Sequence, residues 1–265
     1  QIECLTWDSY RKLKEFYKNS DIAQYHVSNT PNYYLIYVND IETEEELKRF
    51  PSIYNHLIEF KDVLLKRSIN GVLESAYKRG KWWALTTDRP NIDFEGEKIL
   101  CPQRSKINTF GYSASRWYAA SDVFYISLNK KTYNLKYILS ILNSKLILYW
   151  LKYMGKRKGD ILELTLEPLQ FIPVKEISLT EQEPFTLVVD YILFLKAKIN
   201  DKMSFYFEQL IDGMVYELYF ENELKQSGCD ILKHLNDLPE INDEMAEEEK
   251  MKIITKVFNK LYDKE

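Results

Sequence analysis

Residues 134–175 read NLKYILSILNSKLILYWLKYMGKRKGDILELTLEPLQFIPVK. The first half, Leu135–Met154, is apolar enough to predict one long helix, with Asn134 near its N-cap and a stop before Gly155. A basic turn and a short strand then lead to Ile172-Pro173. The helix is long enough for a membrane span, but its polar residues favour a buried helix in a soluble protein: Lys136, Asn143, Lys145 and Lys152.

The segments around this helix contain many candidate strands. Between Ser68 and Leu128 the helical period disappears, and short β-branched or aromatic runs alternate with Gly, Pro, Asn and Asp. The pattern predicts strands at Tyr33–Val38, Trp82–Leu85, Lys98–Cys101, Phe110–Ser113, Val123–Leu128, Ile161–Leu166 and Phe171–Val174.

Helices are expected on both sides of the β-rich block. A short helix at Tyr10–Tyr17 and a longer one from Phe50 to Arg67 come before it. The sequence therefore predicts an α+β fold, with a β-rich domain at 1–178 that carries the inserted long apolar helix, followed by a C-terminal helical region at 179–265. The helices expected in that last region are Pro184–Ile199, Lys202–Leu224 and Glu247–Tyr262.

The net charge of −4 is unevenly distributed along the chain. Residues 201–265 contain 8 Lys and 16 Asp or Glu, so residues 1–200 carry a balance of +4. Within that part, residues 61–106 hold 10 basic and 6 acidic side chains, and residues 145–160 hold 5 basic and 1 acidic. Because phosphate affinity depends on the local field, this distribution permits a nucleic-acid partner despite the negative total.

The sequence lacks the motifs of the common enzyme classes. It has no Gly-rich cofactor loop after a strand, no P-loop, no GxSxG and no HExxH. The three Cys and three His residues are scattered without metal-ligand spacing, so we expect no metal site and reduced thiols in the cytoplasm. No signal peptide is visible, and the chain opens at Gln1, as an excised fragment would.

Cations that alternate with aromatic side chains indicate a nucleic-acid surface. Arg and Lys bind phosphates, and Arg also reaches guanine edges in the major groove. Each run has a structural alternative, because surface cations are often only solvated and at least one of Trp82 and Trp83 is expected in the core. The candidate DNA-binding residues are Arg67, Lys78, Arg79, Lys81, Trp82, Gln103, Arg104, Lys106, Tyr112, Arg116, Lys156, Arg157 and Lys158.

An acidic group between Asp88 and Glu97 leaves a nuclease alternative open. Metal-dependent nucleases place a Lys in a Glu-x-Lys step, where it helps to position the attacking water. Here Glu97 and Lys98 are adjacent, which sends their side chains to opposite faces of a strand. A solvated acidic turn is therefore the favoured interpretation of Asp88, Asp93, Glu95 and Glu97.

A set of motifs follows in order along most of residues 20–222. They are DIAQY (21–25), YYLIYV (33–38), RFPSIYNHL (49–57), LSILNSK (139–145), LQFIP (169–173) and IDGMVYELYF (211–220). In this order they resemble the C-terminal specificity, or target-recognition, domain of TaqI-like and type IIG restriction-modification N6-adenine DNA methyltransferases.

The resemblance implies that residues 1–178 are a DNA target-recognition domain and residues 179–265 a helical spacer or docking region. The implied partners are double-stranded DNA and the methyltransferase domain of a longer parent protein, with no membrane contact. Methyl transfer from S-adenosylmethionine to adenine N6 would belong to that missing domain, so this chain is expected to carry no catalytic residue and no cofactor. A metal-dependent nuclease and a helical protein-interaction module remain as alternatives.

Overall fold

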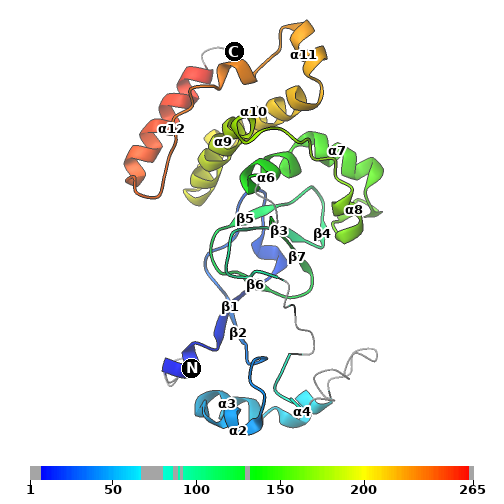
Figure 1. Ribbon diagram of the computed structural model, residues 1–265, viewed down its shortest axis with the longest axis vertical. Coiled ribbons are helices and arrows are strands. Elements are labelled where there is room, and N and C mark those ends of the chain that lie inside the picture. The colour runs from blue at the N-terminus through cyan, green and yellow to red at the C-terminus, as the bar shows by residue number, and fades with distance from the viewer. Residues whose placement is uncertain (1–6, 67–79, 86–88, 90–91, 129–131, 263–265) are drawn as a thin grey trace. The chain divides into compact units, whose positions relative to one another are not determined.

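The computed structural model describes residues 7–66, 80–85, 89, 92–128 and 132–262 (Figure 1). The chain divides into two compact units, each with its own hydrophobic core. The first comprises residues 1–17, 30–94 and 116–118, and the second comprises residues 18–29, 95–115 and 119–265. Helices occur together with small sheets, which confirms the predicted α+β class.

The first unit is built from short helices and a strand pair. Strands β1 (Leu13–Tyr17) and β2 (Tyr33–Ile36) pair antiparallel, and β6 (Tyr118–Ala119) lies on the other side of β1. The helices are α1 (Trp7–Tyr10), α2 (Glu44–Lys48), α3 (Pro51–Ile58) and α4 (Lys61–Leu65). Its core contains Val38, Ile41, Leu47, Ile53, Trp82, Trp83 and Ala84.

Several local predictions for this unit are wrong. Residues 13–17 form a strand instead of a helix, because pairing with β2 satisfies the backbone groups of both strands. Trp82–Leu85 is a turn instead of a strand, and both Trp side chains are buried in the core. The helix expected from Phe50 to Arg67 is divided into α3 and α4, and Arg67 lies outside the described residues.

Two three-stranded sheets lie in the second unit. In one, β3 (Lys98–Pro102) pairs antiparallel with both β5 (Gly111–Ser113) and β7 (Val123–Ile126). In the other, β9 (Ile161–Glu163) pairs with β4 (Arg104–Ser105) and β8 (Arg157–Lys158). The predicted strands that begin at residues 98, 110, 123 and 161 are confirmed, although their ends differ from the predicted ones. Residues 171–174, also predicted as a strand, form none.

The single long apolar helix predicted over Leu135–Met154 is wrong. The structure divides it at Ser144 into α6 (Leu135–Asn143) and α7 (Lys145–Met154), and α6 packs against β3 and β5 (Figure 1). The backbone of Ser144 is extended (φ −68°, ψ 155°), and its hydroxyl accepts a hydrogen bond from the N–H of Ile147. The polar Asn-Ser-Lys step therefore ends one helix and caps the next.

None of the helices in the described part of the chain combines the length and the hydropathy needed to cross a lipid bilayer.

The last third of the chain is helical, as predicted. Helix α9 (Leu179–Ala197) begins well before Pro184, because Ser178 and Glu181 form a capping box. It packs against both α6 and α10 (Asp201–Tyr219), so the second unit continues across residue 178. The assignment of DNA recognition to residues 1–178 and of a spacer or docking role to residues 179–265 stays a prediction. The other helices of this unit are η1 (Asn19–Asp21), α8 (Leu166–Gln170), α11 (Glu221–Ser227), η2 (Leu232–His234) and α12 (Glu247–Tyr262).

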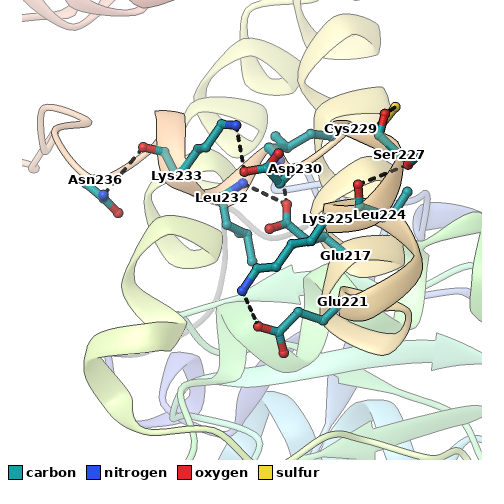
Figure 2. Close-up of polar contacts among 11 residues, drawn as sticks. Glu217, Glu221, Leu224, Lys225, Ser227, Cys229, Asp230, Leu232, Lys233 and Asn236 are labelled. Atoms are coloured by element: carbon teal, nitrogen blue, oxygen red, sulfur yellow. Dashed lines mark hydrogen bonds and ion pairs between the residues drawn. The ribbon is translucent and has the colours of Figure 1, made fainter.

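A buried carboxylate holds the segment after α11 against α10. Glu217 is 4% exposed, and its Oε2 accepts hydrogen bonds from the backbone N–H groups of Ile231 at 2.5 Å and Leu232 at 2.8 Å (Figure 2). Helix α10 and this segment approach closely at Gly213, where a Cβ would lie 2.4 Å from Cδ1 of Ile231. Glycine at this position of α10 thus makes room for the crossing segment.

Candidate nucleic-acid interface

The sheet β4-β9-β8 brings together two basic segments that are far apart in the sequence. Strand β9 pairs Glu163 with Arg104 of β4 on one side, and it pairs Leu162 with Arg157 of β8 on the other. All five cations of these segments are exposed, and we call them the basic surface: Arg104, Lys106, Lys156, Arg157 and Lys158.

One carboxylate lies between the two segments. Glu163 is 14% exposed, and its carboxylate oxygens lie 3.6 Å from Nη2 of Arg104 and 3.5 Å from Nζ of Lys156. Both cations keep 58% of their side chains exposed, so they remain open to an anionic partner. Two acidic residues, Asp160 and Glu163, accompany the five cations of this surface. The local field is therefore positive although the chain as a whole is acidic.

The loop between β4 and β5 is braced from inside. The hydroxyls of Ser105 and Thr109 lie 2.7 Å apart, within hydrogen-bonding distance. The buried Asn108 donates through Nδ2 to the carbonyl oxygens of Leu142 at 2.7 Å and Ser144 at 2.9 Å. The middle of the loop is thus tied at Asn108 to the corner between α6 and α7, while Lys106 and Ile107 at its start are exposed to solvent.

The LNSK segment provides that corner. The side-chain amide of Asn143 donates to the carbonyl of Phe110 at 2.8 Å and accepts from its N–H at 3.1 Å. Lys145 is attached to α10, because Asp212 accepts from its backbone N–H at 2.7 Å and lies 3.0 Å from its Nζ. The corner therefore holds the braced loop and α10 in one arrangement.

The DIAQY segment supports the same loop from the other side. The side-chain amide of Gln24 donates to the carbonyl of Asn108 at 2.7 Å, and the N–H of Tyr25 donates to the carbonyl of Phe110 at 2.8 Å. Tyr25 has a positive φ of 64° and is 2% exposed, and it lies beside Gly111 in a parallel bridge. A Cβ at Gly111 would come within 2.5 Å of Val27, so this segment packs directly on β5.

An open hollow adjoins the basic surface. Its lining combines apolar side chains with polar groups, and no carboxylate is among the described residues that line it. Burial and then the charge of Lys196 lower the pKa of His26 from its usual value. The hollow therefore offers neutral and cationic groups to a bound molecule. It is lined by Asn19, Ser20, Ile22, Ala23, Gln24, His26, Pro102, Arg104, Ser105, Ile107, Thr109 and Lys196.

The sequence matches the family of TaqI-like C-terminal specificity domains over residues 14–174, which is more than half of the chain. The chain belongs to this family. Three of the six motifs that suggested the resemblance are joined here: DIAQY and LNSK both bond the braced loop, and Asp212 in the α10 motif pairs with Lys145 of LNSK.

Curated relatives of this specificity domain are type II methyltransferases. M.HindII of Haemophilus influenzae is 25% identical over 198 residues, which are 72% of this chain and 35% of that protein. M.HincII of the same species is 28% identical, with 72% and 36% covered. M.MjaIV of Methanocaldococcus jannaschii is 27% identical over 232 residues, with 84% and 74% covered. The chain thus spans about a third of the length of the first two relatives.

A solved structure shares the fold. The specificity domain superposes on the Type IIL restriction-modification enzyme MmeI, solved in complex with DNA, with a TM-score of 0.58. The match covers 99% of this chain and 32% of that one at 14% sequence identity. At this level of identity the similarity concerns the fold alone.

Several residues predicted to bind DNA are not on the surface of the specificity domain. Lys81 is 5% exposed, and its Nζ lies 2.6 Å from the carboxylate of Glu42. Trp82 is also 5% exposed, and its Nε1 donates to Glu44. Both residues contact carboxylates of the first unit and do not belong to the basic surface, so their contact with DNA stays a prediction. Three further candidates, Arg67, Lys78 and Arg79, lie outside the described residues.

The remaining candidates fall into different places. Gln103 is half-buried. Its backbone N–H donates a hydrogen bond to the carbonyl of Asp122, and its carbonyl accepts one from the N–H of Leu164. The hydroxyl of Tyr112 donates to Glu97 at 2.5 Å, and burial followed by this contact raises the pKa of Tyr112 far above its usual value. Arg116 is exposed in the first unit, whereas the basic surface belongs to the second.

The nuclease alternative gains no support from the described residues. Among them there is no group of three or more His, Cys, Asp or Glu side chains that could hold a metal ion. Glu97 is occupied by Tyr112, and Asp88 lies outside the described part of the chain.

The residues that support the basic surface could not be recognised from the sequence. Glu163 and Asn108 carry no charge pattern or motif spacing that identifies them as parts of one site, because their partners come from other segments. Gln24 lies in the DIAQY motif, but the motif does not show that its partner is Asn108.

Proposed function

We propose that this chain recognises duplex DNA as the specificity domain of a restriction-modification methyltransferase. The observation that carries the proposal is the sheet β4-β9-β8, which unites two separate basic segments in a chain whose family is defined as a specificity domain. The DNA complex of MmeI, which shares the fold, is consistent with this role.

Within this proposal the two basic segments have different tasks. Lys156 precedes β8, Arg157 and Lys158 form it, and all three are exposed to solvent, which suits contacts to the phosphate backbone that would fix the register of the domain. Arg104 in β4 and Lys106 in the braced loop lie next to residues whose side chains are anchored, Ser105 and Asn108. This anchoring suits the two cations to contacts with base edges in the major groove.

The proposal assigns the chemistry to a methyltransferase domain outside this chain. That domain would bind S-adenosylmethionine and supply the methyl group for adenine N6, in the manner of a type IIG enzyme. The sequence of the chain has no Gly-rich cofactor loop, so we assign it no part in binding that cofactor. Its task is to hold the duplex while a flipped adenine enters the other domain. A restriction-modification role against phage DNA places the protein in the cytoplasm.

A protein contact with the methyltransferase domain is favoured by the outer side of α7. Tyr149, Tyr153 and Met154 are 62%, 69% and 70% exposed, and the two Tyr rings lie 4.5 Å apart. Exposed aromatic and Met side chains at this density are typical of interfaces. The helical residues 179–265 would serve as the spacer or docking region.

The test is a selection of bound duplexes from a randomised pool, followed by affinity measurements at several salt concentrations. The expected result is an enriched sequence motif and a logarithmic salt slope of about 0.9 for each phosphate contact. The absence of both binding and enrichment at low salt would reject the proposal. A salt-insensitive complex with protein and no DNA affinity would instead support the interaction-module alternative.

Charge-reversal variants locate the interface. The pair Arg157→Glu and Lys158→Glu should lower the salt slope by about 1.8 for the two lost phosphate contacts. The matched control is Lys202→Glu with Lys252→Glu, two exposed cations in α10 and α12. An equal loss of DNA affinity in the control pair would show that total charge, and not the basic surface, governs binding.

A further inference from the structure

An apolar side chain projects from the braced loop beside the basic surface. Ile107 is 43% exposed, and it follows the exposed cation Lys106 directly. It lines the open hollow that contains Arg104, and it also lines a second hollow beside Leu148 and Phe205. Ile107 therefore lies between these two hollows of the second unit.

The backbone at Ile107 is held in place from both sides. Thr109 donates through Oγ1 to the carbonyl of Ile107 at 3.2 Å, and the same hydroxyl lies 2.7 Å from that of Ser105. Asn108, the next residue, is 1% exposed and is anchored to the corner between α6 and α7. A side chain on such a loop loses little conformational freedom when it contacts a ligand.

The surroundings of Ile107 select a ligand that is both anionic and locally apolar. Arg104 and Lys106 lie within three residues of it along the chain, and no carboxylate is among the described residues that line the first hollow. The second hollow contains Glu208 and Asp212, which form ion pairs with Lys196 and Lys145. Duplex DNA meets both requirements, because its phosphates pair with the cations. The C5-methyl of thymine is the apolar group that its major groove presents.

We infer that Ile107 contacts the C5-methyl group of a thymine and makes the domain prefer thymine at one position of its target. The inference rests on the proposed function, since it names one element of the DNA that the basic surface would recognise. In this arrangement Arg104 and Lys106 hold the strand, and Ile107 distinguishes thymine from bases without the methyl group.

Replacement of thymine by deoxyuridine tests the contact directly, because it removes the methyl and leaves every hydrogen-bonding group unchanged. Each thymine of the selected motif is replaced in turn, and affinity is measured for the natural chain and for Ile107→Ala. At one position we expect deoxyuridine to weaken binding by the natural chain about fourfold, the factor for one buried methyl group. For Ile107→Ala the same replacement should have no effect.

Ile199→Ala is the matched control, because Ile199 is 83% exposed at the turn after α9 and far along the chain from the loop. It should respond to deoxyuridine as the natural chain does. Equal sensitivity of Ile107→Ala and the natural chain at every thymine, or a selected motif without thymine, would overturn the inference alone. A natural chain that binds no duplex would overturn the proposed function itself.

Discussion

The side chain of Asn143 and the backbone of Phe110 form a two-way hydrogen-bonded pair, with the Nδ2 atom donating at 2.8 Å and Oδ1 accepting at 3.1 Å. An amide in this position replaces the neighbouring strand that Phe110 would otherwise need. The pair connects the end of α6 to the residue before β5, directly below the braced loop. Asn143, which is 7% exposed, is therefore one of the buried polar side chains that hold the loop in place.

Replacement of Asn143 by Ala should destabilise the second unit. The N–H of Phe110 would lose its partner in a buried place, whereas its carbonyl would keep the hydrogen bond from the N–H of Tyr25. We therefore expect the free energy of unfolding to fall by about 1–3 kcal/mol. Urea unfolding followed by circular dichroism measures the change. Asn236→Ala is the control, since Asn236 is exposed and makes one long hydrogen bond to Lys233. Equal effects of both variants would contradict the role of the pair.

Glu163→Gln should strengthen DNA binding. The substitution removes a negative charge between Arg104 and Lys156 and keeps the size of the side chain. We expect duplex affinity to rise about fivefold, which corresponds to about 1 kcal/mol, and the salt dependence to become steeper. Fluorescence anisotropy across a salt series measures both quantities.

The control for that experiment is Glu183→Gln, an exposed carboxylate on α9. An equal gain from Glu183→Gln would mean that only the total charge of the chain matters. A weaker affinity of Glu163→Gln would mean that the carboxylate positions the cations for DNA.

Glu217→Ala should release the segment after α11. Its carboxylate accepts from two backbone N–H groups, and both would remain buried without a partner (Figure 2). We expect a loss of about 2–3 kcal/mol in the free energy of unfolding, with faster hydrogen exchange at Ile231 and Leu232.

The neighbouring Glu221 provides a contrast within the same region. Glu221 pairs with Lys225 at 2.6 Å, but both side chains are more than half exposed. Glu221→Ala should therefore lower the free energy of unfolding much less than Glu217→Ala does, because solvent screens an exposed ion pair. The assignment of Glu217 as the anchor fails if the two variants lose equal stability.

His26 should make stability depend on pH in the mildly acidic range. Burial first, and then Lys196, hold its pKa below the value of about 6.5 expected in the unfolded chain. In the window between the two pKa values the unfolded state binds more protons, so stability falls as the pH drops from about 6.5 toward the folded pKa. Above about 6.5 the contribution is fully present.

Urea unfolding at several pH values tests this dependence. When the pH is lowered from about 7.5 to about 5, the natural chain should lose more free energy of unfolding than His26→Gln does. His56→Gln, which alters an exposed histidine of the first unit, should leave the pH dependence of the second unit unchanged. Parallel pH profiles for the natural chain and His26→Gln would contradict the assignment to His26.

Elements with a strong local signal were predictable from the sequence. The helix expected at Glu247–Tyr262 has those bounds in the structure, because its apolar stripe recurs at the helical period. The strand beginning at Lys98 is also present, since β-branched and aromatic residues between turn signals favour it. The order of the motifs predicted the family, and it located the basic turn at 156–158.

The sequence by itself thus determined the α+β class, the family and the position of the basic segments along the chain. The tertiary structure decided that Ser144 divides the apolar run and that Lys81 and Trp82 are buried. It also decided that β9 joins Arg104 to Arg157 and Lys158 in one sheet. The physical reason is that helix periodicity and turn preference act between neighbours in the chain, whereas strand pairing and burial depend on residues that meet only after folding.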